Sequence, residues 1–131
     1  MKTNTRLRSP LKRAHGLGSA KTGTGHFIVQ RVTAIALVPL SLYVMWLVLA
    51  LADASYAEVR ATVAHPVHAT LLIAFLVNTF WHGQTGMQVI VEDYEHRPGM
   101  ALWLQLAIIF ACALAGIASV LAVLRITFAG A

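Results

Sequence analysis

The residues best suited to chemistry lie in the stretch 78–96, which begins in an apolar run and ends among acids, a tyrosine and a histidine. His82 is deep in the apolar part, where an ionisable ring is costly unless something binds it. Two interpretations stay open: an interhelical hydrogen bond, or an axial bond to a haem iron, which neutral imidazole binds well. One histidine at this depth supplies one ligand, so the iron would be five-coordinate or a second protein would supply the other histidine.

Asp93 and Tyr94 lie where the apolar run meets water. An ordinary acidic helix end is one interpretation, although acids at a helix C-terminus oppose the helix dipole. The other is a quinone site, because a tyrosine hydroxyl beside a carboxylate can hydrogen-bond a quinone carbonyl and supply protons. Arg31, at the mouth of the first apolar run, either anchors in lipid phosphate or pairs with a haem propionate.

Helical spacing relates these groups. At about 100° per residue, Asp93 returns to within about 20° of the direction of His82, roughly 16 Å further along the axis. Polar and small residues on one face of a membrane helix turn toward the bundle and away from lipid. The predicted inward face comprises Asn78, Thr79, His82, Thr85, Gly86, Val89 and Asp93. No role follows from spacing for His26, Gln30, Gln84 or Gln88.

The elements that carry these residues are membrane helices. Of the 131 residues, 58% are hydrophobic and only 11% are charged, against about 25% charged in soluble domains. Three apolar runs predict helices over about 32–52, 66–91 and 100–124, each long enough to cross a bilayer. The predicted fold is therefore an all-α, integral membrane bundle over 26–131, preceded by a basic arm over 1–25. The segments 53–65 and 92–99 are predicted connections, with a turn at Pro98-Gly99.

The positive charge sets the orientation of these helices. A net charge of +5 invites a nucleic-acid interpretation, but seven of the ten Lys and Arg residues precede or enter the first apolar run. Arg97 shares their side of the membrane, and Arg60 and Arg125 lie opposite. The positive-inside rule places the N-terminus and the acidic connection in the cytoplasm, or the matrix. We expect a bacterial cytoplasmic membrane, with the mitochondrial inner membrane as the alternative.

Two further features are expected to be structural. The basic arm is unlike a cleaved signal peptide, whose apolar segment would begin earlier and be shorter, while a transit peptide is discounted less strongly. Cys112 is the single cysteine and lies in an apolar run, so no internal disulfide forms and a buried structural thiol is expected.

Two motifs carry a family resemblance. Residues 26–37 read H-F-I-V-Q-R-V-T-A-I-A-L, and residues 82–94 follow the pattern H-G-x-x-G-M-Q-V-I-x-E-D-Y. Together with three helices in order, they resemble the smaller hydrophobic membrane-anchor subunit of succinate dehydrogenase, respiratory complex II. The second motif is the more specific, since a histidine, glycines and an acid–tyrosine pair recur at fixed spacing. The resemblance extends from about residue 16 to the end.

The resemblance implies roles for four residues. His82 would be one axial ligand of a b-type haem, and the larger cytochrome b anchor subunit would supply the other. Tyr94 would hydrogen-bond ubiquinone beside Asp93, and Arg31 would lie near the haem propionates. The other expected partners are the iron–sulfur subunit and the flavoprotein subunit. By itself the chain would catalyse nothing. The alternatives are a haem-free structural anchor and a small transporter component.

Overall fold

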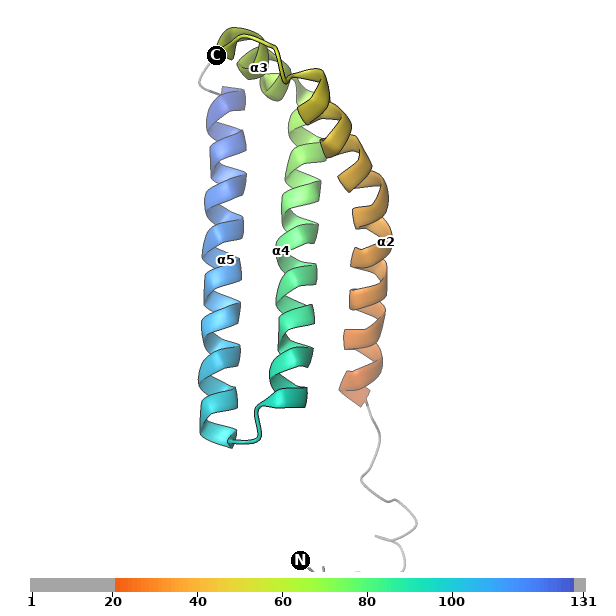
Figure 1. The fold of residues 1–131 in the computed structure, drawn as a ribbon, viewed down its shortest axis with the longest axis vertical. Helices are drawn as coiled ribbons and strands as arrows, with labels where there is room; N and C mark the ends of the chain where they lie inside the picture. The colour runs from red at the N-terminus through yellow and green to blue at the C-terminus, as the bar shows by residue number, and fades with distance from the viewer. Residues whose placement is uncertain (1–20, 129–131) are drawn as a thin grey trace, which may run out of the picture.

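A computed structural model describes residues 21–128, and all the regular structure in that range is helical. Three long helices stand side by side in a row, with α4 (Pro66–Tyr94) between α2 (Lys21–Ala50) and α5 (Pro98–Phe128) (Figure 1). The short helix α3 (Tyr56–Ala64) closes one end of the row. Helix α4 packs on both neighbours, whereas α2 and α5 do not pack on each other over the described residues. The predicted all-α fold is confirmed.

Helix α2 begins earlier than the predicted residue 32. The predicted arm over 1–25 lies mostly outside the described residues, and its last five positions belong to α2. Local helix propensity is weak in this Gly- and Thr-containing start, and Thr24 and Gly25 are exposed, so neither propensity nor burial explains the early start of the helix. Pro39 lies inside the helix, and α2 curves toward α4 in its second half (Figure 1). Proline removes one backbone donor and crowds the preceding turn, which accounts for such a bend.

The connection predicted over 53–65 is not irregular, because most of it forms α3. Ser55 caps this helix: its hydroxyl accepts from the Glu58 backbone N–H at 3.4 Å, and Glu58 accepts from the Ser55 N–H at 2.7 Å. The pattern Ser-x-x-Glu is the sequence signature of such a capping box, so the helix was detectable from the sequence. Helix α3 meets α4 at 81° and packs on both α4 and α5.

Proline starts the two remaining long helices. Pro66 lies in the first turn of α4, where the predicted helix over 66–91 begins, since proline fixes the helical φ and its missing donor is not needed there. The same property explains why Pro98 begins α5, although a turn was predicted at Pro98-Gly99. Helix α4 ends at Tyr94, three residues after the predicted end, where the Glu95 N–H bonds the Val91 carbonyl at 3.0 Å.

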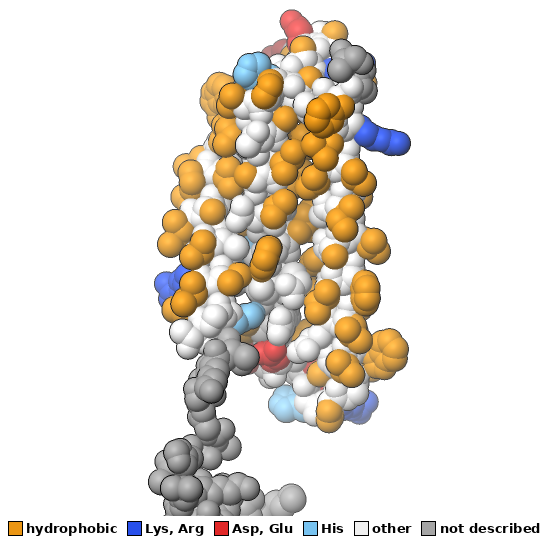
Figure 2. Space-filling view, turned by 180° about the vertical axis from the view of Figure 1, so that it is seen from behind, with side chains coloured by type: hydrophobic (Ala, Val, Ile, Leu, Met, Phe, Trp, Pro, Cys, Tyr) orange, Lys and Arg blue, Asp and Glu red, His pale blue; other side chains and the backbone are white. Residues whose placement is uncertain are grey.

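Little of the described chain is buried against itself. Only Leu47, Ala69 and Val123 among its hydrophobic residues are buried. Figure 2 shows hydrophobic side chains along the whole length of the visible face, with acidic side chains at its two ends. Helices α2 and α5 are each long and apolar enough to cross a membrane, and α4 qualifies when joined with α3. A row with so small a core depends on lipid and on other proteins to cover its apolar faces.

Candidate functional site

His82 is held by the neighbouring helix. Its Nδ1 lies 3.1 Å from the hydroxyl of Thr33 on α2, and Thr33 is only 8% exposed. No hydrogen bond to Nε2 comes from the described residues, and this atom is not among their buried, unpartnered atoms. One ring nitrogen is therefore fixed inside the chain and the other remains accessible to a partner. Because the described residues hold no cluster of three metal-ligating side chains, any metal at His82 needs ligands from elsewhere.

A second polar pair lies one turn away. Gln30 of α2 accepts a hydrogen bond through its Oε1 from the hydroxyl of Thr85, which is 5% exposed. The same hydroxyl lies 3.0 Å from the carbonyl of His82. Together Gln30, Thr33, His82 and Thr85 form what we call the α2–α4 polar contact. A role for Gln30, which spacing did not reveal, follows from this pairing across two antiparallel helices.

His26 lies on α2 one turn beyond the α2–α4 polar contact. The pairs Thr33–His82 and Gln30–Thr85 run antiparallel, so one turn further His26 lies at the level of Val89. Its Nε2 is buried and has no hydrogen-bond partner in the described part of the chain. A buried unpaired nitrogen is unfavourable, and residues 21–128 leave this one without a hydrogen bond.

The predicted inward face is inward at its centre only. Thr85 is buried, while Asn78, His82 and Gly86 are half-buried against α2. The other members, Thr79, Val89 and Asp93, are exposed. The difference has a simple cause: in a row of three helices α4 has two open faces, so one neighbour cannot cover the whole stripe.

Asp93 and Tyr94 lie at the end of α4, and Tyr94 is 81% exposed. Both side chains are free of the α2–α4 polar contact, roughly 16–18 Å along the axis from His82. The Tyr94 carbonyl accepts a hydrogen bond from Nδ1 of His96 at 3.1 Å. The acid–tyrosine pair is thus presented at the surface of the chain, next to the connection to α5.

Arg31 is exposed and does not pair with an acid in the described range. Its guanidinium lies over the ring of Phe27, 4.9 Å from the centroid, a favourable cation–π contact. Arg31 is two residues before Thr33, hence about 3 Å away along the axis but about 200° around α2, on the side turned away from α4. A cation at this level remains available to an anionic group outside the chain.

Gln84 and Gln88, to which helical spacing assigned no role, are hydrogen-bonded along α4. Gln84 donates to Oε1 of Gln88 at 3.4 Å, and Gln88 donates to Oε1 of Glu92 at 3.0 Å. Gln105 of α5 also donates to this carboxylate oxygen, at 3.4 Å. The i, i+4 spacing of the three α4 residues was readable from the sequence, but the fourth partner requires the α4–α5 packing.

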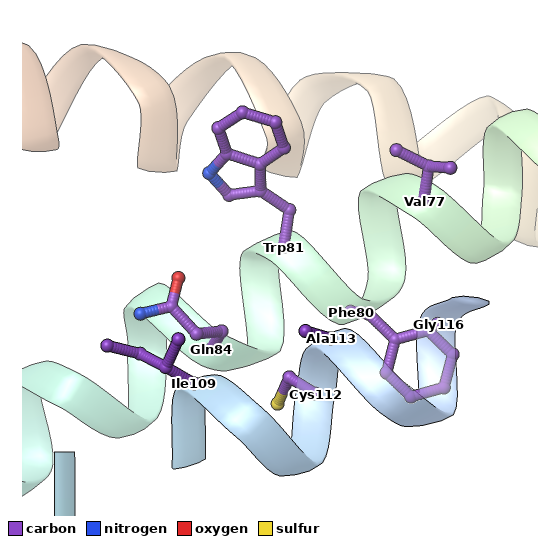
Figure 3. A pocket seen from close by; sticks show the side chains of 8 residues that line it. All are labelled: Val77, Phe80, Trp81, Gln84, Ile109, Cys112, Ala113 and Gly116. Carbon is purple, nitrogen blue, oxygen red and sulfur yellow. The ribbon is translucent and has the colours of Figure 1, made fainter. Parts of the chain in front are cut away.

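An apolar groove of about 270 Å³ lies between α4 and α5. Its eight lining residues are labelled in Figure 3: Phe80 lies against Gly116, Cys112 comes from α5, and Trp81 extends toward α2. An added Cβ at Gly116 would lie 3.4 Å from the Phe80 ring, an ordinary van der Waals contact, so the space beside Phe80 would also accept alanine. Cys112 is free and only half-buried in this groove, so the buried position expected for it is not seen.

At the opposite end of the row, His68 hydrogen-bonds the hydroxyl of Tyr43 through Nδ1 and stacks on its ring at 6.1 Å between centroids. His65 lies 5.5 Å from His68, ring to ring. His68 thus joins α2 to α4 near α3. It is well separated from His82, fourteen residues or roughly 21 Å along the helix.

The fold and these contacts define a class: an all-helical, multi-pass membrane protein with polar side chains between its helices and at its surface. Comparison with known proteins gives the family. Residues 5–123 match the family described as "Succinate dehydrogenase/Fumarate reductase transmembrane subunit". The chain belongs to this family and is a membrane anchor of the succinate dehydrogenase type.

The similar proteins agree on this assignment. The chain is 33% identical over 88 residues to the succinate dehydrogenase hydrophobic membrane anchor subunit of Rickettsia bellii, covering 67% of this chain and 70% of that one. It is 31% identical over 86 residues to the subunit of the same name from Paracoccus denitrificans, covering 66% and 67%. A membrane anchor subunit from Reclinomonas americana is 30% identical over 79 residues, covering 58% and 66%.

Proposed function

We propose that this anchor holds a b-type haem at His82, jointly with the larger cytochrome b anchor subunit, and forms part of the ubiquinone site at Tyr94. The proposal rests on how the two ring nitrogens of His82 are hydrogen-bonded in a chain of this family. Thr33 engages Nδ1, and Nε2 has no partner among the described residues. A membrane-embedded imidazole with one free nitrogen is suited to bind an iron from outside the chain.

The surroundings of His82 fit a flat, anionic cofactor. Gly83 follows it on the helix, and a Cβ added there would meet nothing within 4 Å, so the surface beside the ring is smooth and open. Arg31 supplies an exposed guanidinium near the same level, suited to pair with a propionate. In this proposal His82 binds the iron, Arg31 neutralises a propionate, and the glycine surface lets the porphyrin approach the helix.

Bound there, the haem would supply a one-electron carrier within the membrane. The chain itself would orient the iron ligand through Thr33 and exclude water through the apolar faces of α2 and α4. The larger anchor subunit would supply the other protein ligand.

The quinone site is proposed at the cytoplasmic end of α4. Ubiquinone takes up two electrons and two protons to become ubiquinol, so the site must provide a hydrogen-bond donor at a carbonyl and a route for protons. The Tyr94 hydroxyl would donate to one carbonyl, and the neighbouring Asp93 carboxylate would relay protons from water. The exposure of both residues supports a site completed by another subunit.

The electrons would come from succinate, whose oxidation to fumarate releases two electrons and two protons in the flavoprotein subunit. The iron–sulfur subunit would pass them to the quinone as part of the tricarboxylic acid cycle and the aerobic respiratory chain. We propose the bacterial cytoplasmic membrane, with the N-terminus and the α4–α5 connection cytoplasmic; the mitochondrial inner membrane is the alternative. The structure puts the start of α2 and the end of α4 at the same end of the row, as this orientation requires (Figure 1).

One observation favours a rival function. The Thr33–His82 hydrogen bond satisfies one ring nitrogen between two helices, which is what a haem-free structural anchor would need. The two functions differ in what the assembled complex contains. Purification through a tag on this chain, followed by haem extraction, should give one haem b per copy together with the three partner subunits. A complex with full succinate dehydrogenase activity and no haem would establish the structural role instead.

A further inference from the structure

We infer that Thr33 is a positioning residue that holds His82 in the Nδ1–H tautomer and thereby sets the strength of His82 as a ligand. The inference rests on the haem proposed above, and it names a residue that no motif spacing singled out. It concerns a contact between two side chains of this chain, Thr33 on α2 and His82 on α4.

The contacts of the Thr33 hydroxyl support one direction for this hydrogen bond. The hydroxyl has one proton and lies 2.9 Å from the Val29 carbonyl and 3.2 Å from the Gln30 carbonyl. A carbonyl oxygen only accepts, and the Val29 carbonyl is closer to the hydroxyl than His82 is, so we assign the proton to the helix of Thr33. The lone pairs of the hydroxyl then face Nδ1 of His82, 3.1 Å away, and Nδ1 donates to them.

This tautomer leaves the lone pair on Nε2. A histidine that binds metal through one nitrogen commonly donates its other N–H to an acceptor, which fixes the ring and raises its basicity. Thr33 fills that acceptor position here. Since Thr33 is 8% exposed, water does not replace the contact readily, and in so apolar a setting the bond is stronger than at a surface.

The neighbouring contact keeps this bond in register. Gln30 pairs with Thr85 one turn away, and the Thr85 hydroxyl also lies 3.1 Å from the Trp81 carbonyl. A slip of α2 along α4 would break both interhelical bonds together. The position of Thr33 opposite His82 is therefore defined by two side-chain pairs.

The expected consequence is a change in the reduction potential of the bound haem. A more basic imidazole stabilises ferric over ferrous iron, so loss of the Thr33 acceptor should raise the midpoint potential. Loss of such an outer contact commonly weakens metal binding 10- to 100-fold. We expect about tenfold weaker haem retention, at the low end because the lost acceptor is a neutral hydroxyl.

The test uses the purified four-subunit complex and two substitutions at one site. Thr33→Val keeps the shape and removes the hydroxyl, whereas Thr33→Ser keeps the hydroxyl. Thr70→Val is the matched control, because Thr70 is an exposed threonine on α4 whose hydroxyl bonds only its own helix, the Pro66 carbonyl at 2.8 Å. Optical redox titration and the EPR spectrum of the ferric haem are the readouts.

Thr33→Val should raise the midpoint potential and change the EPR g-values, while Thr33→Ser and Thr70→Val stay close to the unchanged protein. Loss of haem from Thr33→Val alone also supports the inference. It is overturned when Thr33→Val titrates like the unchanged protein, or when Thr33→Ser and Thr33→Val behave alike, since the methyl group and packing would then be responsible. If the unchanged complex has no haem, the proposed function itself fails.

Discussion

Gly83 offers a sharp test of what covers α4 beside His82. In this chain a Cβ at Gly83 would have open space, with no atom within 4 Å. Replacing a helix-interior glycine by alanine stabilises the helix by about 1 kcal/mol. If nothing else approached this surface, Gly83→Ala should therefore stabilise the protein slightly.

If a cofactor or partner helix covers that surface, Gly83→Ala should destabilise the contact instead of stabilising the protein. Forcing extra atoms into a packed contact costs about 1–3 kcal/mol. After the helix gain is subtracted, up to about 2 kcal/mol remains, roughly a 30-fold loss in haem binding. The larger Gly83→Leu should bind still less haem, while the isolated helix remains unstrained.

The assay is the haem content per anchor in purified complexes, beside their thermal stability. Gly99→Ala at the start of α5 is the matched control, since a Cβ there also meets nothing. We expect both Gly83 variants to lose haem and Gly99→Ala to keep it. Full haem content in Gly83→Leu would refute the reasoning, because a surface that accepts leucine is not covered by a closely packed group.

Three further predictions concern other contacts. In a double-mutant cycle, Gln30→Leu and Thr85→Val should couple by about 0.6 kcal/mol, and at most about 1.7, in the thermal stability of the complex; additive effects would mean that the pair does not bond. Tyr94→Phe should lower quinone reduction up to about tenfold, the value of one hydrogen bond near 1.4 kcal/mol, with succinate oxidation by an artificial acceptor unchanged; equal loss of both would indicate failed assembly. The backbone N–H and hydroxyl of Ser55 hold the pKa of Glu58 below its ordinary value. The capping box therefore stabilises α3 fully at pH values above the ordinary carboxyl pKa, and this stabilisation is lost as the pH falls through the lowered pKa of Glu58. Hydrogen-exchange protection of α3 should therefore drop in acid, and Glu58→Gln should show little such dependence.

The sequence predicts the three long helices because uninterrupted apolar runs have few alternatives in a membrane. Their ends are less predictable. Helix α2 begins before its apolar run, among weak helix formers, and Pro98 begins α5 where the Pro-Gly pair indicated a turn. The polar connection predicted over 53–65 contains helix α3, although Ser55 and Glu58 have the spacing of a capping box.

The site is predictable to a similar degree. Helical phase brings His82 and Thr85 to one face, and α2 covers that face at its centre. The helical phase of α4 does not predict which residues of the neighbouring helix lie opposite it. The roles of Thr33 and Gln30 are therefore seen only once the register of α2 against α4 is known. Nor does the helical phase say which stripe of α4 the neighbours leave open, which is why Asp93 and Thr79 are exposed. The haem and quinone roles remain predictions.

The most direct measurement is the reduced-minus-oxidised spectrum of the purified complex carrying His82→Leu. His68→Leu is the control, since it removes a histidine of the same helix that bonds Tyr43 at the far end of the row. The account predicts that the haem b band is lost or strongly altered in His82→Leu and preserved in His68→Leu. An unchanged haem b spectrum in His82→Leu would contradict it.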